Sequence, residues 1–346
     1  MPVLRLFRRI AALILASWAM AAAAAEPLFV PVYERNFPDP HIVLHNGEFI
    51  AYATNAGINL PMLASRDLVH WTEVTGADGN RIDGMPVLAP WVKEGRTWAP
   101  EVMQVGGKWL LYYTAANAKR NVQCVGVAVA DQPKGPFRDA SAEPLVCQYD
   151  QGGTIDANPF RDSDGKLYLY YKSDGNAVGK TTYIWGQQLS ADGLSLAGRP
   201  VPLIKDDAEW EWRLVEAPAM VRAPRGGYQL FYSAAFFGWD PRERLSRYAT
   251  GYASCQGPLG PCADAPENPI LFSFNKSDLG CLSGPGHPAI FQVGRQHFIA
   301  FHAWAASRAC RKARDERWLY VAPLYWRDGK PEIGLSLRQS TKAERG

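Results

Sequence analysis

The stretch "NPFRDSDGKLYLYYKS", residues 158–173, places a proline, a Gly-centred turn and an aromatic run in close succession. Aromatic runs bounded by Gly, Asn and Asp clusters are typical of β-strands. Proline has no N–H group and is tolerated at the first residue of a strand but not in its middle. The stretch therefore predicts two short strands that form a hairpin, with the proline marking where the first strand begins.

The same pattern recurs along the chain. The other copies are "DPHIVLHNGEFIAYAT" from Asp39, "APEVMQVGGKWLLYYT" from Ala99, "APAMVRAPRGGYQLFYSA" from Ala217 and "HPAIFQVGRQHFIAFHA" from His287. The five prolines, at 40, 100, 159, 218 and 288, are 60, 59, 59 and 70 residues apart, which fits four-stranded blades with sizeable loops. Sheets packed face to face around an axis bury what a lone hairpin cannot. The sequence predicts an all-β fold, a five-bladed β-propeller of four-stranded antiparallel blades around a central channel.

Residues 1–25 have a basic start, an apolar stretch and an alanine-rich end, a pattern typical of a secretory signal peptide. We therefore expect a secreted or periplasmic protein in which residues 26–335 form one propeller domain and residues 336–346 a polar tail. No later segment approaches the roughly 18 uninterrupted apolar residues of a membrane-spanning helix, so no membrane association is expected.

The composition, 47% hydrophobic and 12% aromatic over 346 residues, is ample for a folded core. The formal charge of +3 falls to zero once the three arginines of residues 1–25 are removed. This balance argues against a nucleic-acid partner. We expect a monomer.

The six cysteines suit three disulfides in an exported chain, although sequence alone leaves 15 pairings open. Our hypothesis pairs neighbours in order: Cys124 with Cys147, Cys255 with Cys262, and Cys281 with Cys310. Metal ligation by cysteine is disfavoured because the chain has no Cys-x-x-Cys spacing.

The residues one to three positions before the prolines are Asp39, Trp98, Asp156, Glu216 and His287. Because the innermost strands of a propeller begin at one end of the channel, these side chains are expected to share one pocket. Like charges raise the pKa of at least one of several neighbouring carboxyls. Two carboxyls of unequal protonation are what glycoside hydrolysis requires. Aromatic residues expected to stack on sugar rings are Phe37, Trp98, Trp185, Trp212, Phe237 and Trp239.

The motifs "FPDPHIV", "TWAPEV", "IDANPFRDSDGKLYLYY", "LVEAPAMV" and "GPGHPAIF", in that order, resemble the blade starts of glycoside hydrolase family 43. Members are five-bladed propellers that attack arabinans, arabinoxylans and xylo-oligosaccharides with inversion. The resemblance implies that Asp39 is the general base, Glu216 the general acid and Asp156 the auxiliary acid that tunes and orients the pair. It also implies that His287 helps to hold a structural Ca²⁺ or another cation near the axis, and that the chemistry needs no cofactor. One departure is Ala157, where the family commonly has a proline.

Inversion predicts roughly 6.5 to 9.5 Å between the carboxyls of Asp39 and Glu216, against about 5 to 5.5 Å in a retaining enzyme. The extra C-terminal β-sandwich of many xylosidases in the family is not expected, which favours an α-L-arabinofuranosidase or an endo-arabinanase on an oligosaccharide or polysaccharide substrate. The alternatives are a β-xylosidase and a non-catalytic sugar-binding propeller. A fructan-cleaving propeller would need an Asn-Asp-Pro-Asn-Gly start, which residues 37–41 lack.

A basic run near the end of the chain contains Arg308, Arg311, Arg314 and Arg317. We interpret it as a solvated loop before the last strand, the alternative being that one of these arginines reaches a sugar hydroxyl.

Overall fold

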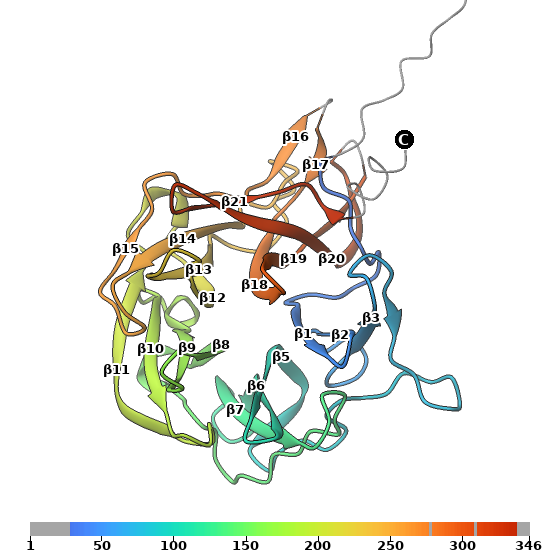
Figure 1. Ribbon diagram of the computed structural model, residues 1–346, viewed down its shortest axis with the longest axis vertical. Coiled ribbons are helices and arrows are strands. Elements are labelled where there is room, and N and C mark those ends of the chain that lie inside the picture. The colour runs from blue at the N-terminus through green and yellow to red at the C-terminus, as the bar shows by residue number, and fades with distance from the viewer. Residues whose placement is uncertain (1–27, 277–278, 308–309, 338–346) are drawn as a thin grey trace, which may run out of the picture.

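The structure is a computed structural model that describes residues 28–276, 279–307 and 310–337. Within this part of the chain, five antiparallel sheets surround a central axis in the order of the sequence, and the last sheet lies beside the first (Figure 1). The predicted all-β five-bladed propeller is confirmed. The predicted signal peptide at residues 1–25 lies outside the described residues, as does most of the predicted tail.

The blades are built from consecutive strands. Blade 1 contains β1 (His41–His45), β2 (Glu48–Tyr52), β3 (Met62–Ser65) and β4 (Thr72–Glu73), and blade 2 contains β5 (Val92–Val105), β6 (Lys108–Asn117) and β7 (Gln123–Ala130). Blade 3 contains β8 (Thr154–Arg161), β9 (Leu167–Ser173), β10 (Tyr183–Leu189) and β11 (Leu196–Lys205). Blade 4 contains β12 (Val215–Arg222), β13 (Tyr228–Ala234), β14 (Ala249–Cys255) and β15 (Cys262–Asp264). Blade 5 contains β18 (Gly286–Val293), β19 (Gln296–Ala306), β20 (Lys312–Arg327) and β21 (Lys330–Ile333).

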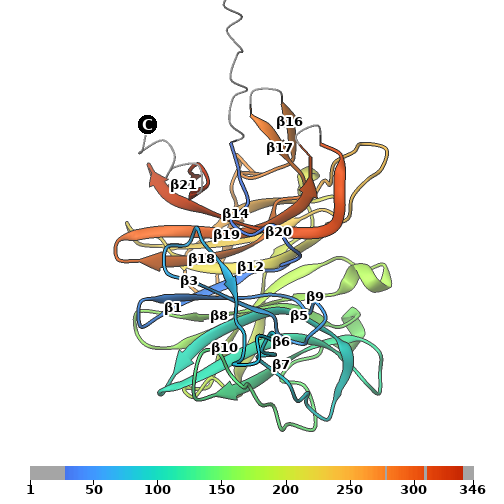
Figure 2. The same ribbon diagram turned by 90° about the vertical axis from the view of Figure 1, so that its right-hand side faces the viewer.

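A separate hairpin, β16 (Phe274–Lys276) with β17 (Gly280–Leu282), connects blades 4 and 5 and protrudes beside blade 5 in both views (Figures 1 and 2). Three short 3₁₀ turns complete the described elements: η1 (Tyr149–Gln151), η2 (Gly175–Val178) and η3 (Glu209–Glu211). No helix of the described residues is both long and apolar enough to cross a membrane.

Blade 2 departs from the expected four strands, because its described sheet has three. The following segment makes only isolated bridges to β7, at Val129 with Arg138 and at Val125 with Val146. Pro133, Pro136 and Pro144 lie in this segment. Since each lacks an N–H group, the segment cannot form a continuous ladder.

The innermost strands share a backbone feature, a left-handed residue within the strand or just before it. One non-glycine residue per blade has a left-handed backbone; these are Asp39 (φ 54°), Ala99 (45°), Asp156 (57°), Ala217 (53°) and His287 (55°). In blades 2 to 5 the pairing with the second strand shifts register at this residue, as in a β-bulge. Such residues cost of order 1–3 kcal/mol each and gather at functional sites. The bulge turns one side chain of each blade toward the axis.

This feature corrects the alignment of the third repeat. In the other four blades, a proline directly follows the left-handed residue, whereas Ala157 follows Asp156. The structural counterpart of the other prolines is therefore Ala157, and Pro159 lies two residues farther along the strand. Asp156 occupies the same position in its blade as Asp39 does in blade 1.

The left-handed residues are tied to neighbouring blades by their backbone N–H groups. The bonds run from Asp39 to His302 Nδ1 (3.1 Å), from Ala99 to Thr54 Oγ1 (2.9 Å), from Asp156 to Thr114 Oγ1 (3.0 Å), from Ala217 to Asp156 Oδ2 (2.9 Å) and from His287 to Ser233 Oγ (2.8 Å). Each accepting side chain belongs to the preceding blade. These five bonds form a ring around the channel and satisfy N–H groups that the bulges remove from the sheets.

Blades 5 and 1 meet along the segment that precedes β1. The N–H groups of Val32 and Phe37 donate to the carbonyls of Leu319 (2.9 Å) and Arg317 (2.8 Å) in β20. The Arg317 N–H in turn donates to Asn36 Oδ1 (3.0 Å). No strand is exchanged between the two described blades, so backbone and side-chain contacts along this seam close the propeller.

The core lies between neighbouring blades. One buried cluster joins Tyr52 of blade 1 to Tyr113 of blade 2, and another joins Tyr170 of blade 3 to Tyr232 of blade 4. The predicted disulfides are confirmed: Cys124–Cys147, Cys255–Cys262 and Cys281–Cys310.

Candidate active site

A pocket of about 290 Å³ lies where the innermost strands begin. Its lining comes from all five blades: Asp39, Thr54, Trp98, Ile155, Asp156, Glu216, Phe237, His287 and Arg317. The five axial residues expected from the repeats thus meet in one cavity. In three blades the left-handed residue itself lines the cavity: Asp39, Asp156 and His287. In the other two blades the lining residue directly precedes the left-handed alanine: Trp98 and Glu216.

Asp39 is held by side chains from blades 1 and 5. Arg317 Nη1 donates to Asp39 Oδ1 at 2.9 Å, and Thr54 Oγ1 donates to Asp39 Oδ2 at 2.5 Å. The Nδ1 atoms of His302 and His287 lie 3.3 and 3.5 Å from Asp39 Oδ1. Burial by itself would raise the pKa of Asp39, but Arg317 and then His287 outweigh it and hold that pKa well below its usual range. Asp39 is therefore a carboxylate at neutral pH.

Asp156 has the opposite electrostatic character. Its side chain is buried, and the only hydrogen bond the structure gives its carboxyl comes from the Ala217 N–H to Oδ2 at 2.9 Å. Burial raises the pKa of Asp156 to about 7, with Glu216 and Asp39 adding to the rise and His287 and Lys172 opposing it. Among the pocket's carboxyls, Asp156 is therefore one that can hold a proton near neutral pH.

Glu216 is paired with a buried lysine. Lys172 Nζ lies 3.1 Å from Glu216 Oε2 and 3.2 Å from Asp174 Oδ1, and the lysine side chain is only 1% exposed. Burial would lower the pKa of Lys172, but Glu216, Asp174 and Asp156 outweigh burial and raise it. The charged ammonium fixes Oε2 of Glu216.

His287 and His302 stand side by side near the axis, with ring centroids 6.3 Å apart. Burial and then Arg317 lower the pKa of His302 to about 3, so this imidazole is neutral. Asp39, the carboxylate within 3.5 Å of His287, is already bonded to Arg317 and Thr54, whereas Ca²⁺ takes six to eight oxygen ligands, waters included. Among the described residues, no group of three or more His, Cys, Asp or Glu side chains is arranged to hold a metal ion. The expected cation near His287 has no support from these contacts.

Only some of the aromatic residues predicted to bind substrate line the pocket. Trp98 and Phe237 line the pocket. Phe37 does not: it is 1% exposed and packs edge-on against Tyr33 in the core between blades 1 and 5. Trp185 packs against Tyr183 in β10 of blade 3, and Trp239 lies half-buried in the loop after β13 without lining this pocket. An aromatic side chain is required by a blade core as well as by a sugar site, so residue type alone does not separate the two.

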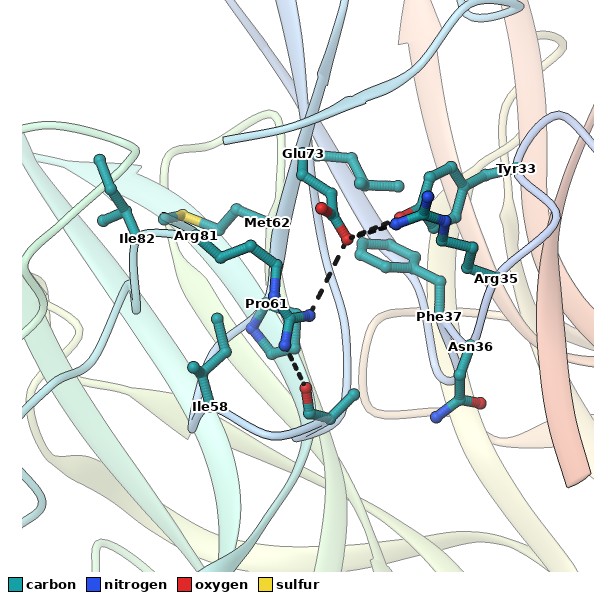
Figure 3. Close-up of a pocket in the computed structure, with 12 residues that line it drawn as sticks. Tyr33, Arg35, Asn36, Phe37, Ile58, Pro61, Met62, Glu73, Arg81 and Ile82 are labelled. Carbon is teal, nitrogen blue, oxygen red and sulfur yellow. Dashed lines mark hydrogen bonds and ion pairs between the residues drawn. The ribbon is translucent and has the colours of Figure 1, made fainter. Parts of the chain in front are cut away.

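A second cavity, of about 340 Å³, lies between the segment before β1 and the loops of blade 1 (Figure 3). Glu73 is at its centre, where Tyr33 Oη donates to Oε1 at 3.0 Å and Arg35 and Arg81 approach to 3.6 and 4.0 Å. Arg81 also donates to the Ala56 carbonyl at 3.0 Å. These charged groups pair with one another. We therefore interpret the cavity as part of the packing contact between the N-terminal segment and blade 1.

Two charged residues of the site were missed by sequence reasoning. Arg317 was assigned with its basic neighbours to a solvated loop, but it lies in β20 and bonds Asp39, while Arg314 remains largely exposed. Lys172 carried a usable signal, because it is the one charged residue of β9, whose residues are all buried. A lysine at such a position requires an acidic partner.

The sequence matches the family described as Glycosyl hydrolases family 43 over residues 30–331. The chain is 25% identical over 317 residues to a beta-D-galactofuranosidase of Aspergillus niger, covering 86% of this chain and 82% of that protein. It is 27% identical over 298 residues to an extracellular endo-alpha-(1->5)-L-arabinanase of Bacillus subtilis, covering 77% of this chain and 58% of that protein. A crystal structure of a thermostable family-43 glycoside hydrolase matches with a TM-score of 0.73 at 27% identity, covering 86% and 92% of the two chains.

These matches agree with the motifs at the five blade starts and with the observed propeller. The family match spans most of the chain and includes every residue that lines the pocket. The chain therefore belongs to glycosyl hydrolases family 43 and is a glycoside hydrolase.

Proposed function

We propose that the protein is an inverting hydrolase of α-L-arabinofuranosides, acting on arabinose-containing plant polysaccharides or oligosaccharides. The observation that carries the proposal is the meeting of three carboxyl groups in three different environments within one pocket. Asp39 lies beside a guanidinium, Glu216 beside an ammonium, and Asp156 is buried without a cationic hydrogen-bond partner. These differences separate Asp39, which is held ionised, from Asp156, which can hold a proton near neutral pH.

Asp39 serves as the general base. Its low pKa keeps it ionised, and a carboxylate can take a proton from the water that attacks the anomeric carbon. Arg317 and Thr54 fix both carboxylate oxygens, so the direction of attack is set before substrate binds.

Glu216 serves as the general acid and donates a proton to the departing glycosidic oxygen. Lys172 fixes Oε2, which leaves Oε1 to face the substrate. Asp156 is the auxiliary acid, and its pKa of about 7 provides the pocket with a protonated carboxyl near neutral pH. The displacement uses only these side chains and water, so it requires no metal ion or cofactor.

The substrate assignment rests on what the relatives are named for. Galactofuranose and the arabinose of arabinan both have five-membered rings, and the two relatives above are named for these sugars. We therefore propose a furanoside as the substrate class of this chain.

The disulfides and a relative named as extracellular support a place of action outside the cytoplasm. We propose that the protein works outside the cytoplasm, where disulfides persist. We further propose that it acts as a monomer, since one chain supplies every group of the pocket.

The test combines substrate choice with stereochemistry. The protein is expected to hydrolyse p-nitrophenyl α-L-arabinofuranoside faster than the β-D-xyloside, and to release β-arabinose first from arabino-oligosaccharides, as seen by NMR during the reaction. Faster hydrolysis of the xyloside would instead support a β-xylosidase. Release of α-arabinose first would show retention and would overturn the assigned roles.

A non-catalytic sugar-binding propeller is excluded by a separate measurement. The Glu216→Gln variant should lose hydrolysis of arabino-oligosaccharides while still binding them in calorimetry. Wild-type protein that binds these ligands without cleaving them would contradict the proposal.

A further inference from the structure

A groove of about 350 Å³ lies beside the pocket, over blade 4. Its lining includes Trp210, Trp212, Ser246, Arg247 and Phe272. Trp212 is 59% exposed and Phe272 is 53% exposed, which makes them two of the most exposed large apolar side chains among the described residues. Exposed aromatic surface of this kind usually marks a binding site.

Trp212 is displayed by a rigid and strained turn. Trp212 and Arg213 have φ values of 48° and 64°, so two successive non-glycine residues adopt the left-handed conformation. Side chains of this kind persist in such backbone only when the surroundings enforce it. The turn is anchored by Glu211, which is fully buried and accepts hydrogen bonds from the Ala208 N–H (2.7 Å) and from Tyr232 Oη (2.8 Å).

Arg247 fixes the indole itself. Its guanidinium carbon lies 3.7 Å from the centre of the Trp212 ring, and Glu243 pairs with the same guanidinium. One face of the indole is thus occupied by a cation, while the large exposed fraction shows that the remaining surface meets solvent. A preorganised aromatic surface binds with little loss of conformational entropy.

The groove and the pocket share a wall. Phe237 lines the pocket, and Ser246, which lines the groove, donates to the Phe237 carbonyl at 2.9 Å. Phe236 packs against Phe237 with ring centroids 5.0 Å apart and is itself 64% exposed. The loop between β13 and β14 that carries these residues therefore borders both cavities.

We propose that this groove is a remote sugar-binding subsite, in which Trp212 and Phe272 contact a saccharide residue of the same polymer chain whose bond is cleaved in the pocket. Sugar rings present C–H faces to aromatic side chains and hydroxyls to polar ones, and Glu243 and Arg247 supply polar groups at this groove. The inference rests on the proposed function, because it requires a substrate long enough to reach from pocket to groove.

The proposal is tested with arabino-oligosaccharides of increasing length and with p-nitrophenyl α-L-arabinofuranoside. In the wild type, kcat/KM should rise once the chain is long enough to reach the groove. Trp212→Ala and Phe272→Ala should each raise KM for the long oligosaccharides roughly 5- to 30-fold, the usual effect of losing one aromatic anchor. Both variants should hydrolyse the aryl glycoside as the wild type does. The matched control is Tyr325→Ala, because Tyr325 is 49% exposed but belongs to the part of β20 that pairs with β21.

Binding is measured apart from catalysis in the Glu216→Gln background. Glu216→Gln should be retarded in gels that contain debranched arabinan, and Glu216→Gln/Trp212→Ala should migrate more freely. Equal retardation of the two proteins, or equal KM values for Trp212→Ala and wild type on long oligosaccharides, would overturn the subsite. A Trp212-dependent dimer with unchanged KM would assign the groove to self-association and would also overturn it. Failure of the proposed function is distinguishable, since the aryl arabinofuranoside would then not be hydrolysed by any of the proteins.

Discussion

Removing Arg317 should make the enzyme less tolerant of acid. Arg317 Nη1 donates to Asp39 Oδ1 at 2.9 Å, and Arg317 is the strongest of the charges that lower the pKa of Asp39. Arg317→Met keeps much of the side-chain volume but deletes the charge and the hydrogen bond. The backbone bonds between Arg317 and the segment before β1 are retained in the variant.

The size of the effect follows from the contact. A hydrogen bond to a charged group contributes about 1.5–3 kcal/mol. One pKa unit corresponds to about 1.4 kcal/mol. Losing the bond should therefore raise the pKa of Asp39 by about one to two units. Because the base must be ionised, activity falls as the pH drops through this pKa, and the acid limb of the pH profile should move upward by the same amount.

The assay is kcat/KM against pH for p-nitrophenyl α-L-arabinofuranoside. Arg317→Lys retains the charge and should show a smaller shift. Arg314→Met is the matched control, because Arg314 belongs to the same strand but is largely exposed and should leave the profile unchanged. An acid limb of Arg317→Met that coincides with that of the wild type, in a protein with native circular dichroism, would refute the assignment of Asp39 as a base tuned by Arg317.

Three further outcomes are expected. Lys172→Met should lower the free energy of unfolding by about 3–5 kcal/mol, measured with urea, because it leaves Glu216 and Asp174 without their buried cation; the exposed Lys205→Met should change it by less than about 0.5 kcal/mol. Glu216→Gln should slow hydrolysis of arabino-oligosaccharides about 10²- to 10⁴-fold. Hydrolysis of a substrate with a more acidic leaving group should be slowed much less. Equal losses of rate on both substrates would count against general-acid catalysis by Glu216. Asp156→Asn should alter how the stability of the fold depends on pH. The folded-state pKa of Asp156, about 7, lies above the ordinary 3.8. In the wild type, the contribution of Asp156 to the free energy of unfolding is therefore complete below pH 3.8 and is lost as the pH rises through 7. Melting temperatures at pH 5 and pH 8 should therefore differ less in the variant than in the wild type, and an unchanged difference would argue against a proton on Asp156.

The propeller could be predicted because its signals are local. Each hairpin is encoded within about 16 residues by a proline, a turn and an aromatic strand, as in residues 158–173. The third repeat was nevertheless placed two residues off, because Pro159 was taken as the counterpart of the other prolines. The true marker is the left-handed backbone at Asp156, which a sequence does not display.

The acids of the site could be predicted because repeated positions must converge on the axis. Their electrostatic partners could not, since Arg317 and Lys172 reach Asp39 and Glu216 from other blades. No spacing of residues in the sequence predicts an ion pair between side chains of different blades. The aromatic residues show the same limit, because burial decides whether Phe37 supports the core or Trp98 faces the cavity.

Because the N–H bonds between adjacent blades position the carboxyl groups, hydrolysis depends on the presence of all five blades. Thr114 takes no part in the proposed chemistry, yet its hydroxyl accepts the Asp156 N–H and thereby sets where that carboxyl sits. Each reactive group is aligned in this way by a sheet other than its own. A partly folded chain with four sheets in place would carry intact carboxyls but no working centre. We therefore expect catalysis only after all five bonds between neighbouring blades have formed.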